Sequence, residues 1–321
     1  VAKTVPNMSE IDKNNFDKAL LLSIAYAATI GGMSTLVGTA PNIVFSSFMQ
    51  EVYGLEIFMD DWMKLGVPVS ICMLGLAWVI LTRVVYPVNF TASDETKNIL
   101  SQMLSDMGPM SKDEFRVGIV FFIAVVLWMF RSLIDNYVIG LTDAGIAITV
   151  AIALFIIPSS GRNGELLAWE QSSKLPWGLL LLFGGGLSLG VQINDTGLGL
   201  WIGQSLINLE TVPLVILVMA VAALIIFLTE VTSNVATTST FLPVFGAVAV
   251  AVGVAPEVLT VPVVLAASCA FMLPVATPPN AIVYGANKFK IIDMMRAGFL
   301  INIAGIFVVT IFAYYFAKVI F

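Results

Sequence analysis

An apolar segment at residues 267–283 contains two adjacent prolines, Pro278 and Pro279, followed by Asn280. Proline donates no backbone hydrogen bond and its ring clashes with the preceding turn, so a helix must break within this segment. In a lipid bilayer, a broken backbone is tolerated only where protein buries it or where it lines a cavity. Broken helices whose ends meet near the bilayer midplane are typical of secondary transporters. The segment therefore predicts a chain organised around an intramembrane break.

The composition indicates an all-α polytopic membrane protein. Of the 321 residues, 59% are hydrophobic and 11% are charged, whereas roughly a quarter of a soluble domain is charged. The chain has no histidine, and its two cysteines, Cys72 and Cys269, lie in apolar runs. Neither a disulfide framework nor a thiolate metal site is therefore predicted. No basic patch interleaved with aromatic residues indicates a nucleic-acid partner, and the expected surroundings are the lipid bilayer.

A second broken helix is predicted at 19–49, where two glycine-rich strings interrupt an apolar run. Residues 38–44 read Gly-Thr-Ala-Pro-Asn-Ile-Val, and residues 276–282, which lie 238 positions later, read Ala-Thr-Pro-Pro-Asn-Ala-Ile. Five predicted crossings separate the starts of the two copies, which would therefore enter the membrane from opposite faces, as in an inverted repeat. A chance match of a short string is the alternative, and the position of both copies inside apolar runs argues against it.

The remaining segments are predicted to complete the two parts of this repeat. A cytoplasmic lead-in at 1–18 is followed by the end of the first repeat at 19–86, which contains the broken helix at 19–49 and a span at 63–86. A cytoplasmic linker at 87–115, with a surface helix near 94–107, leads to the second repeat at 116–321. The second repeat contains spans at about 115–131, 137–157 and 175–193, an interfacial helix at 195–209, a hairpin at 212–254, the broken helix at 258–288 and a last span at 297–317.

The hairpin has apolar arms at 212–228 and 241–254 around a polar tip at 229–240. The length of the arms alone fits either a re-entrant hairpin or two full spans. The tip contains one acid, Glu230, no Lys or Arg, and many small hydroxyl residues. Such a composition is typical of the lining of a site rather than of an aqueous loop, so we predict re-entry.

Charge placement predicts the orientation of the chain. With seven predicted crossings, twelve of the 15 Lys and Arg residues fall on one side, and only Lys64, Arg131 and Lys318 fall on the other. Lys and Arg accumulate in cytoplasmic loops. We therefore expect an integral protein of a bacterial inner (plasma) membrane, with the N-terminus of this chain in the cytoplasm and its C-terminus outside.

The breaks and the tip offer two kinds of binding group. The N-terminus of a half-helix presents unpaired N–H groups and a partial positive charge, which suit an anion. Unwound carbonyls and the side-chain oxygens of Ser, Thr and Asn are neutral, hard ligands that suit Na⁺. Ser233 and Asn234 also fit an ordinary N-cap before an apolar helix. Glu230 is either a coupling group or a helix-packing residue, and the sequence leaves both readings open.

The segment 267–283 resembles the signature of the divalent anion/sodium symporter family, which carries dicarboxylates, tricarboxylates and sulfate. The residues that carry the resemblance are Ser268, Phe271, Pro274, Ala276, Asn280 and Val283. Thr-Ser-Asn at 232–234 resembles the Ser-Asn-Thr hairpin motif of that family, and the broken helix at 31–44 resembles its first-repeat partner.

The resemblance implies an elevator-type carrier, usually a homodimer, that uses Na⁺ as its coupling ion. Carried over to this sequence, it assigns two sets of residues. One sodium ion would be held by Thr229, Thr232, Asn234 and Ala276, and Gly38 would serve the other sodium site. The substrate would contact Thr39, Ser233, Asn234, Thr277 and Pro278.

Two features depart from the family pattern. Val235 stands where the hairpin motif has Thr, so one hydroxyl contact to the substrate would be missing. The hairpin that should precede the first broken helix is also absent from this sequence. We therefore expect the chain to correspond to the C-terminal two-thirds of a longer carrier and not to transport by itself.

The predicted function is sodium-coupled symport of a small dianion, most simply a C4-dicarboxylate such as succinate. With no Lys or Arg at the tip, bound Na⁺ would supply the positive charge for the anion. The alternatives are an anion exchanger, or an ion antiporter or arsenite-type exporter that depends on an essential carboxylate, for which uptake by Glu230→Gln against pH is the test. An enzyme is not predicted, because the predicted spans offer no histidine and no paired-Asp motif from which a catalytic or metal site could be built. A purely structural subunit would leave the repeated breaks unexplained.

Overall fold

The computed structural model describes residues 10–87, 98, 101–102, 104–134, 141–161, 164–172, 181, 184–185, 188, 191–192, 195–198, 201 and 212–321. These residues are predominantly helical and contain no β-strand, only an isolated bridge between Pro158 and Glu165. The helical class predicted from composition is therefore confirmed. The predicted span at 175–193, the interfacial helix at 195–209 and the surface helix near 94–107 lie largely outside the described residues.

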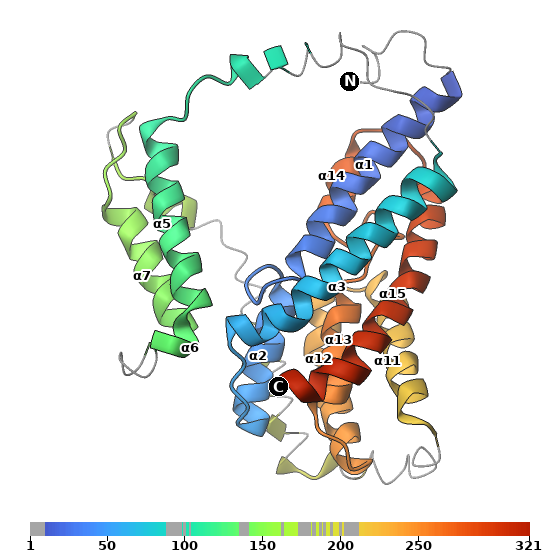
Figure 1. Ribbon diagram of the computed structural model, residues 1–321. Helices are drawn as coiled ribbons and strands as arrows, with labels where there is room; N and C mark the ends of the chain where they lie inside the picture. The colour runs from blue at the N-terminus through green and yellow to red at the C-terminus, as the bar shows by residue number, and fades with distance from the viewer. Residues whose placement is uncertain are drawn as a thin grey trace. The chain divides into compact units, whose positions relative to one another are not determined.

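The chain forms two compact units, of which the first comprises residues 1–57, 61–91 and 178–321. Its helices are shown in Figure 1. They are α1 (Glu10–Gly32), α2 (Ala40–Tyr53), α3 (Met59–Val79) with a π-helical continuation η2 (Ile80–Val85), α11 (Leu214–Thr229), α12 (Asn234–Ala251), α13 (Glu257–Ala267), α14 (Pro278–Gly285) and α15 (Ile291–Ile320).

Both predicted helix breaks are present. Residues 33–39 separate α1 from α2, and residues 268–277 separate α13 from α14. Helix α1 packs against α14 and α2 packs against α13, so the two broken helices run antiparallel (Figure 1). Helix α1 begins inside the predicted lead-in, where Lys18 forms an ion pair with Asp293 of α15 at 3.0 Å.

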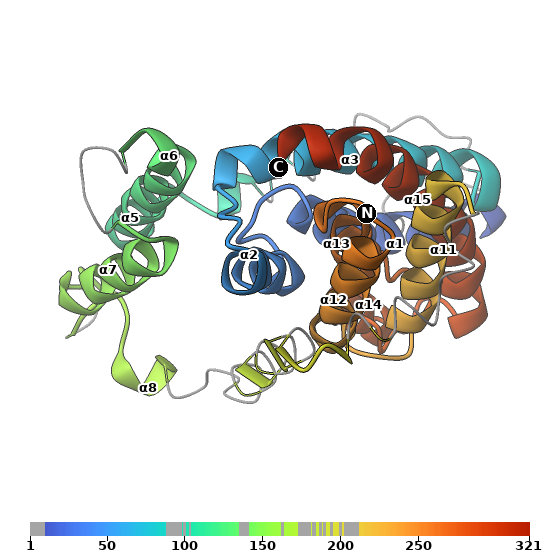
Figure 2. The ribbon, with the colours of Figure 1, turned by 90° about the horizontal axis from the view of Figure 1, so that it is seen from below.

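The predicted hairpin is a pair of helices, α11 and α12, joined at residues 230–233. Each helix packs more extensively against α13 than against its partner, and Figure 2 shows α13 between α2 and α11. The polar tip is shorter than the predicted 229–240, because α12 already begins at Asn234. The hydroxyls of Thr237 and Thr238 donate to the carbonyls of Ser233 and Asn234, at 3.0 and 2.8 Å, and are thereby accommodated in the helix.

Three helices of the described residues are long and apolar enough to cross a membrane by length and composition. They are Met59–Val85, Asn234–Ala251 and Ile291–Ile320. Re-entry of the hairpin stays a prediction.

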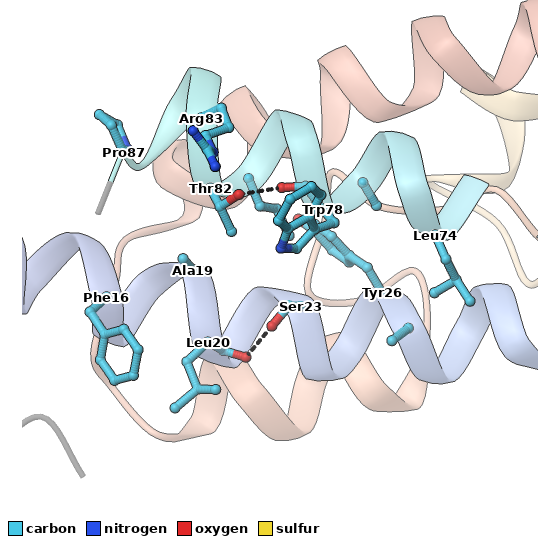
Figure 3. Close-up of a pocket in the computed structure, with 13 residues that line it drawn as sticks. Phe16, Ala19, Leu20, Ser23, Tyr26, Leu74, Trp78, Thr82, Arg83 and Pro87 are labelled. Atoms are coloured by element: carbon cyan, nitrogen blue, oxygen red, sulfur yellow. Dashed lines mark hydrogen bonds between the residues drawn. The ribbon is translucent and has the colours of Figure 1, made fainter. Parts of the chain in front are cut away.

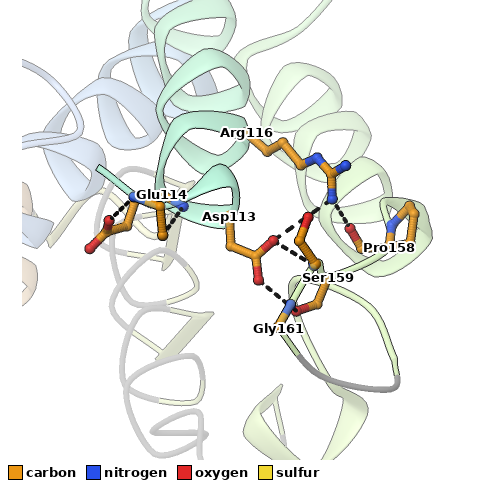
Figure 4. Close-up of polar contacts among 8 residues, drawn as sticks. Asp113, Glu114, Arg116, Pro158, Ser159 and Gly161 are labelled. Carbon is orange, nitrogen blue, oxygen red and sulfur yellow. Dashed lines mark hydrogen bonds and ion pairs between the residues drawn. The ribbon is translucent and has the colours of Figure 1, made fainter. Parts of the chain in front are cut away.

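The second unit comprises residues 58–60 and 92–177 and contains α5 (Lys112–Met129), α6 (Arg131–Ile134), α7 (Asp143–Ile156) and the short α8 (Trp169–Ser172). Figure 4 shows how the start of α5 holds the segment after α7. Asp113 accepts hydrogen bonds from the Ser159 hydroxyl at 2.6 Å and from the Ser160 N–H at 2.7 Å. Arg116 donates to the carbonyl of Pro158 at 2.6 Å. These bonds add side-chain links to the packing of α5 against α7.

Two glycines let long helices approach the breaks. A Cβ at Gly66 of α3 would lie 2.6 Å from the Met33 carbonyl oxygen. A Cβ at Gly298 of α15 would overlap the carbonyl of Phe271 and lie 2.6 Å from Met272 N. Met33 and Phe271 are equivalent positions of the two breaks, 238 residues apart. Each break is thus covered by a helix that has no side chain at the point of contact.

We expect Gly298→Ala to destabilise the first unit by about 1–3 kcal/mol, because the new methyl group meets backbone that cannot move without disturbing the break. The matched control is Gly75→Ala on α3, where a Cβ would have no atom within 4 Å. The melting temperatures of both variants are measured by thermal unfolding of the detergent-solubilised full-length protein. Equal melting temperatures for Gly298→Ala and the wild type would show that the contact tolerates a methyl group.

The contacts of Asp113 predict a pH effect. The Ser159 hydroxyl and then the Ser160 N–H hold the pKa of Asp113 below its ordinary value, because they stabilise the charged carboxylate. A lowered folded-state pKa contributes stability above the unfolded pKa, and this contribution is lost as the pH falls through the folded pKa. Asp113→Asn should therefore lower the melting temperature at neutral pH, and the difference from the wild type should vanish in acid. The control is Asp106→Asn at an exposed position; a difference that persists in acid contradicts the prediction.

Candidate functional site

The two helix breaks are held by the same hydrogen bonds. In the first, the amide nitrogen of Asn42 donates to the carbonyls of Gly32 at 3.5 Å and Thr35 at 2.8 Å. In the second, Asn280 donates to the carbonyls at 270 and 273, both at 3.0 Å. All three positions of the first set lie 238 residues before those of the second. The similarity of the two breaks therefore extends beyond the short matching string to the geometry of the backbone.

A buried aromatic donor meets the same carbonyl in each break. Trp62 of α3 donates its indole N–H to the Met33 carbonyl at 3.0 Å. Tyr26 of α1 donates its hydroxyl to the Phe271 carbonyl at 2.8 Å. Both aromatic side chains are fully buried. An unpaired carbonyl would be costly in these surroundings, so these donors stabilise the broken conformation.

Each break ends in a threonine that precedes a proline-led helix. Thr39 and Thr277 have nearly the same extended backbone, with φ and ψ of −147° and 143° and of −143° and 152°. Pro41 is the second residue of α2, and Pro278 and Pro279 are the first two of α14, positions at which the missing N–H would have no partner within the helix in any case. The Thr277 hydroxyl accepts from the Asn280 N–H at 3.4 Å. Both helices therefore start with a fixed, preorganised N-terminus.

The hairpin joins the second break through oxygen atoms. The hydroxyl oxygen of Thr229 lies 2.7 Å from the side-chain oxygen of Asn234 and 2.9 Å from the carbonyl oxygen of Ala267. A hydroxyl has one proton, so it serves only one of these acceptors at a time. Three neutral oxygens thus lie together at a buried position, because Thr229 is 0% exposed. This donor set fits a hard cation such as Na⁺.

The other predicted sodium ligands are placed differently. Thr232 is exposed, and its hydroxyl oxygen lies 2.6 Å from that of Thr237 and 2.9 Å from the Leu228 carbonyl. Ala276 is buried at the far end of the second break. Gly38 is exposed in the first break, and a Cβ there would overlap the carbonyl of Gly32. Only glycine therefore fits position 38.

The predicted substrate residues form two groups. Ser233 is the exposed N-cap of α12 and makes no capping hydrogen bond with its side chain. Thr277 is buried, Pro278 is exposed and Thr39 is half-buried. In the described part of the chain, no hydrogen bond joins the tip to the end of the break at 276–278. The tip is joined to the beginning of the break instead, through Ala267.

Sequence reasoning left the role of Glu230 open between a coupling group and a helix-packing residue. One of its carboxylate oxygens accepts from the N–H groups of Phe271 and Met272, and the other accepts from Leu273, at 2.7, 2.8 and 3.0 Å. The side-chain amide of Asn302 donates to the oxygen that Phe271 and Met272 also bind, at 2.7 Å. The structure therefore favours the packing reading of Glu230. The signal in the sequence was a single acid between two apolar arms, since unwound N–H groups in apolar surroundings need an acceptor.

These bonds also correct the test suggested for Glu230. Glu230→Gln would disturb the hydrogen bonds to the break whatever the transported ion is. A loss of activity in this variant consequently does not separate an antiporter from a sodium symporter.

A cavity of about 1130 Å³ lies between α1 and α3 with its continuation η2 (Figure 3). Its walls are mainly apolar, and Arg83 lines it as the one charged residue among the lining residues. The hydroxyls of Ser23 and Thr82 donate to carbonyls of their own helices, at 2.9 and 2.8 Å. None of the predicted site residues lines this cavity, so it is distinct from the oxygen cluster at the hairpin.

Comparison with known proteins identifies the family. A family model described as "Sodium:sulfate symporter transmembrane region" matches residues 3–321. The chain is 38% identical, over 307 residues, to a protein named sodium-dependent dicarboxylate transporter SdcS from Staphylococcus saprophyticus subsp. saprophyticus; this match covers 94% of the chain and 59% of that protein. It is 37% identical to a protein of the same name from Staphylococcus aureus strain USA300, over 96% of the chain and 60% of that protein. The chain thus spans about three fifths of the length of these relatives. The family resemblance seen in the sequence is confirmed: the chain belongs to the sodium:sulfate symporter family of integral membrane proteins.

Proposed function

We propose that the full-length protein is a secondary transporter, not an enzyme, that couples the uptake of a small dianion to sodium. The observation that carries this proposal is the cluster of neutral oxygens from Thr229, Asn234 and Ala267, which joins the hairpin tip to the second break. The names of the similar staphylococcal proteins favour a dicarboxylate as the substrate. Succinate is our specific candidate.

The residues divide between the ion and the anion. Thr229, Thr232, Asn234 and Ala276 would hold one sodium ion, and Gly38 would serve a second. Ser233 and Asn234, with Thr39, Thr277 and Pro278, would meet the carboxylates of the substrate. A bound Na⁺ supplies positive charge to a site in which the tip itself carries no Lys or Arg. The N-termini of α2, α12 and α14 add partial positive charge for the anion.

The antiparallel broken helices support an inverted repeat, and we propose an elevator-type homodimer with a re-entrant hairpin in a bacterial plasma membrane. The N-terminus of this chain would face the cytoplasm and the C-terminus the outside. Gly66 and Gly298 set an offset of 232 between α3 and α15. Leu74, Ala77 and Leu81 line the cavity beside α1, and their counterparts Ile306, Val309 and Ala313 lie on α15, against which α11 packs. Leu74 is 37% exposed, whereas its counterpart Ile306 is 7% exposed. We propose that the cavity holds the corresponding hairpin of the first repeat.

We expect Asn234→Ala in the full-length protein to reduce sodium-dependent uptake of labelled succinate by at least about tenfold, because an oxygen beside Thr229 is lost. Initial rates in membrane vesicles, with and without a sodium gradient, measure the effect. Asn14→Ala on α1 is the control, since Asn14 is an exposed asparagine remote from the hairpin in sequence. Unchanged uptake with normal sodium dependence would overturn the assignment.

The driving ion and the substrate can be tested in the same vesicles. Competition by citrate, tartrate and sulfate identifies the dianion. Uptake that depends on preloaded dicarboxylate rather than on sodium would indicate an exchanger, and uptake driven by an imposed pH gradient would indicate proton coupling.

A further inference from the structure

We infer that Glu230 is a positioning residue that fixes the unwound backbone of the second break and, through it, the ion and substrate residues at the end of that break. This inference rests on the proposed function only for its effect on transport. It assigns to Glu230 a fixed hydrogen-bonding role rather than the carriage of an ion.

The carboxylate of Glu230 replaces the missing helix partners of three successive residues. Phe271, Met272 and Leu273 all direct their N–H groups at it, within 3.0 Å. Asn302 of α15 donates to the same oxygen as Phe271 and Met272, at 2.7 Å. The side chain is 4% exposed, and in the described part of the chain no Lys or Arg forms a salt bridge with it. Hydrogen bonds to a charged acceptor are roughly twice as strong as neutral ones, so a neutral side chain at position 230 would hold these N–H groups less strongly.

Leu273 connects the hydrogen bonds of Glu230 to the proposed site. The N–H of Leu273 donates to Glu230, while its carbonyl accepts from the Ala276 N–H at 3.2 Å and from the Asn280 side chain at 3.0 Å. Ala276 is a proposed sodium ligand, and Asn280 lies in the first turn of α14. Leu273 therefore links Glu230 both to the proposed sodium site and to the N-terminus of α14, which is proposed to face the anion.

Two neighbouring residues of the hairpin hold the break at two points. Thr229 contacts the carbonyl of Ala267, where α13 ends, and Glu230 binds the N–H groups that follow. The tip and the first half of the break therefore form one hydrogen-bonded unit. Displacement of Glu230 would alter both the oxygen cluster and the path to Ala276.

The first break satisfies two of the three equivalent N–H groups within its own segment. There the N–H groups of Met33 and Ser34 donate to the carbonyls of Ile30 and Gly31, at 3.1 and 3.2 Å, within their own segment. The equivalent N–H groups of Phe271 and Met272 donate to Glu230 instead. Both breaks accept a hydrogen bond from a distant aromatic side chain, and in the described part of the chain the N–H groups of the second break also bind a distant carboxylate.

The experiment compares Glu230→Gln, Glu230→Asp and Glu257→Gln in the full-length protein. Gln keeps an oxygen for Phe271 and Met272 but turns an NH₂ group toward the Leu273 N–H. Glu257 is the matched control, because it is a buried carboxylate in the first turn of α13, before the break. Initial rates of labelled succinate uptake are measured against sodium concentration, with protein quantity and monodispersity checked for each variant.

We expect Glu230→Gln to raise the sodium concentration for half-maximal uptake at least about fivefold, and Glu257→Gln to leave it unchanged. Glu230→Asp, which retains the charge on a shorter side chain, should give a smaller increase. If Glu230→Gln does not yield folded protein, the comparison of Glu230→Asp with Glu257→Gln decides. Wild-type sodium dependence in every folded Glu230 variant would overturn the inference.

A second measurement does not depend on transport. Val275, in the break, is 83% exposed, and a Val275→Cys variant in a Cys72→Ser background reports on the backbone beside it through its rate of reaction with a soluble maleimide. Adding Glu230→Gln should accelerate this reaction several-fold, and adding Glu257→Gln should not. Equal rates would overturn the inference even where transport fails. A wild type without sodium-dependent uptake would overturn the proposed function and leave the labelling result to decide the role of Glu230.

Discussion

Backbone hydrogen bonds that a helix cannot make for itself determine the arrangement of the first unit. Each break leaves N–H and C=O groups without helical partners in apolar surroundings, where an unpaired group is costly. The partners come from four buried side chains, Asn42, Asn280, Trp62 and Tyr26, and from the carboxylate of Glu230. The packing of α1, α3, α11 and α15 around the breaks follows from the need to bring these side chains into place.

Close helix contact has the same origin. Gly66 and Gly298 let α3 and α15 reach the carbonyls at Met33 and Phe271, which a side chain would keep at a distance. Asn302 then reaches Glu230 from α15. Gly298 and Asn302 lie four positions apart on α15 and cover the second break from the same side.

Sequence reasoning located the breaks, the helical class and the repeat, because proline and the Thr-X-Pro-Asn string act on the local backbone. It placed the start of α1 too late, since charged residues in 10–18 concealed a helix that is tied to α15 through Lys18 and Asp293. It made the polar tip too long, since threonine hydroxyls can bond back to the preceding turn inside a helix. The partners of Glu230 lie 41 to 43 residues away along the chain. No local pattern encodes such a contact, so the sequence left the role of Glu230 open.

The asymmetry between the breaks bears on how the protein is made. The first break is closed by contacts within about one turn of itself, by Asn42 and by Trp62, which follows Met33 by 29 residues, so its partners are synthesised soon after it. The second break needs Glu230, which precedes it in the chain and is already present when residues 271–273 emerge. Asn302 and α15 arrive last and enclose an assembled junction. The order of the residues along the chain is therefore also a workable order of insertion, in which an acceptor is present before the donors that require it.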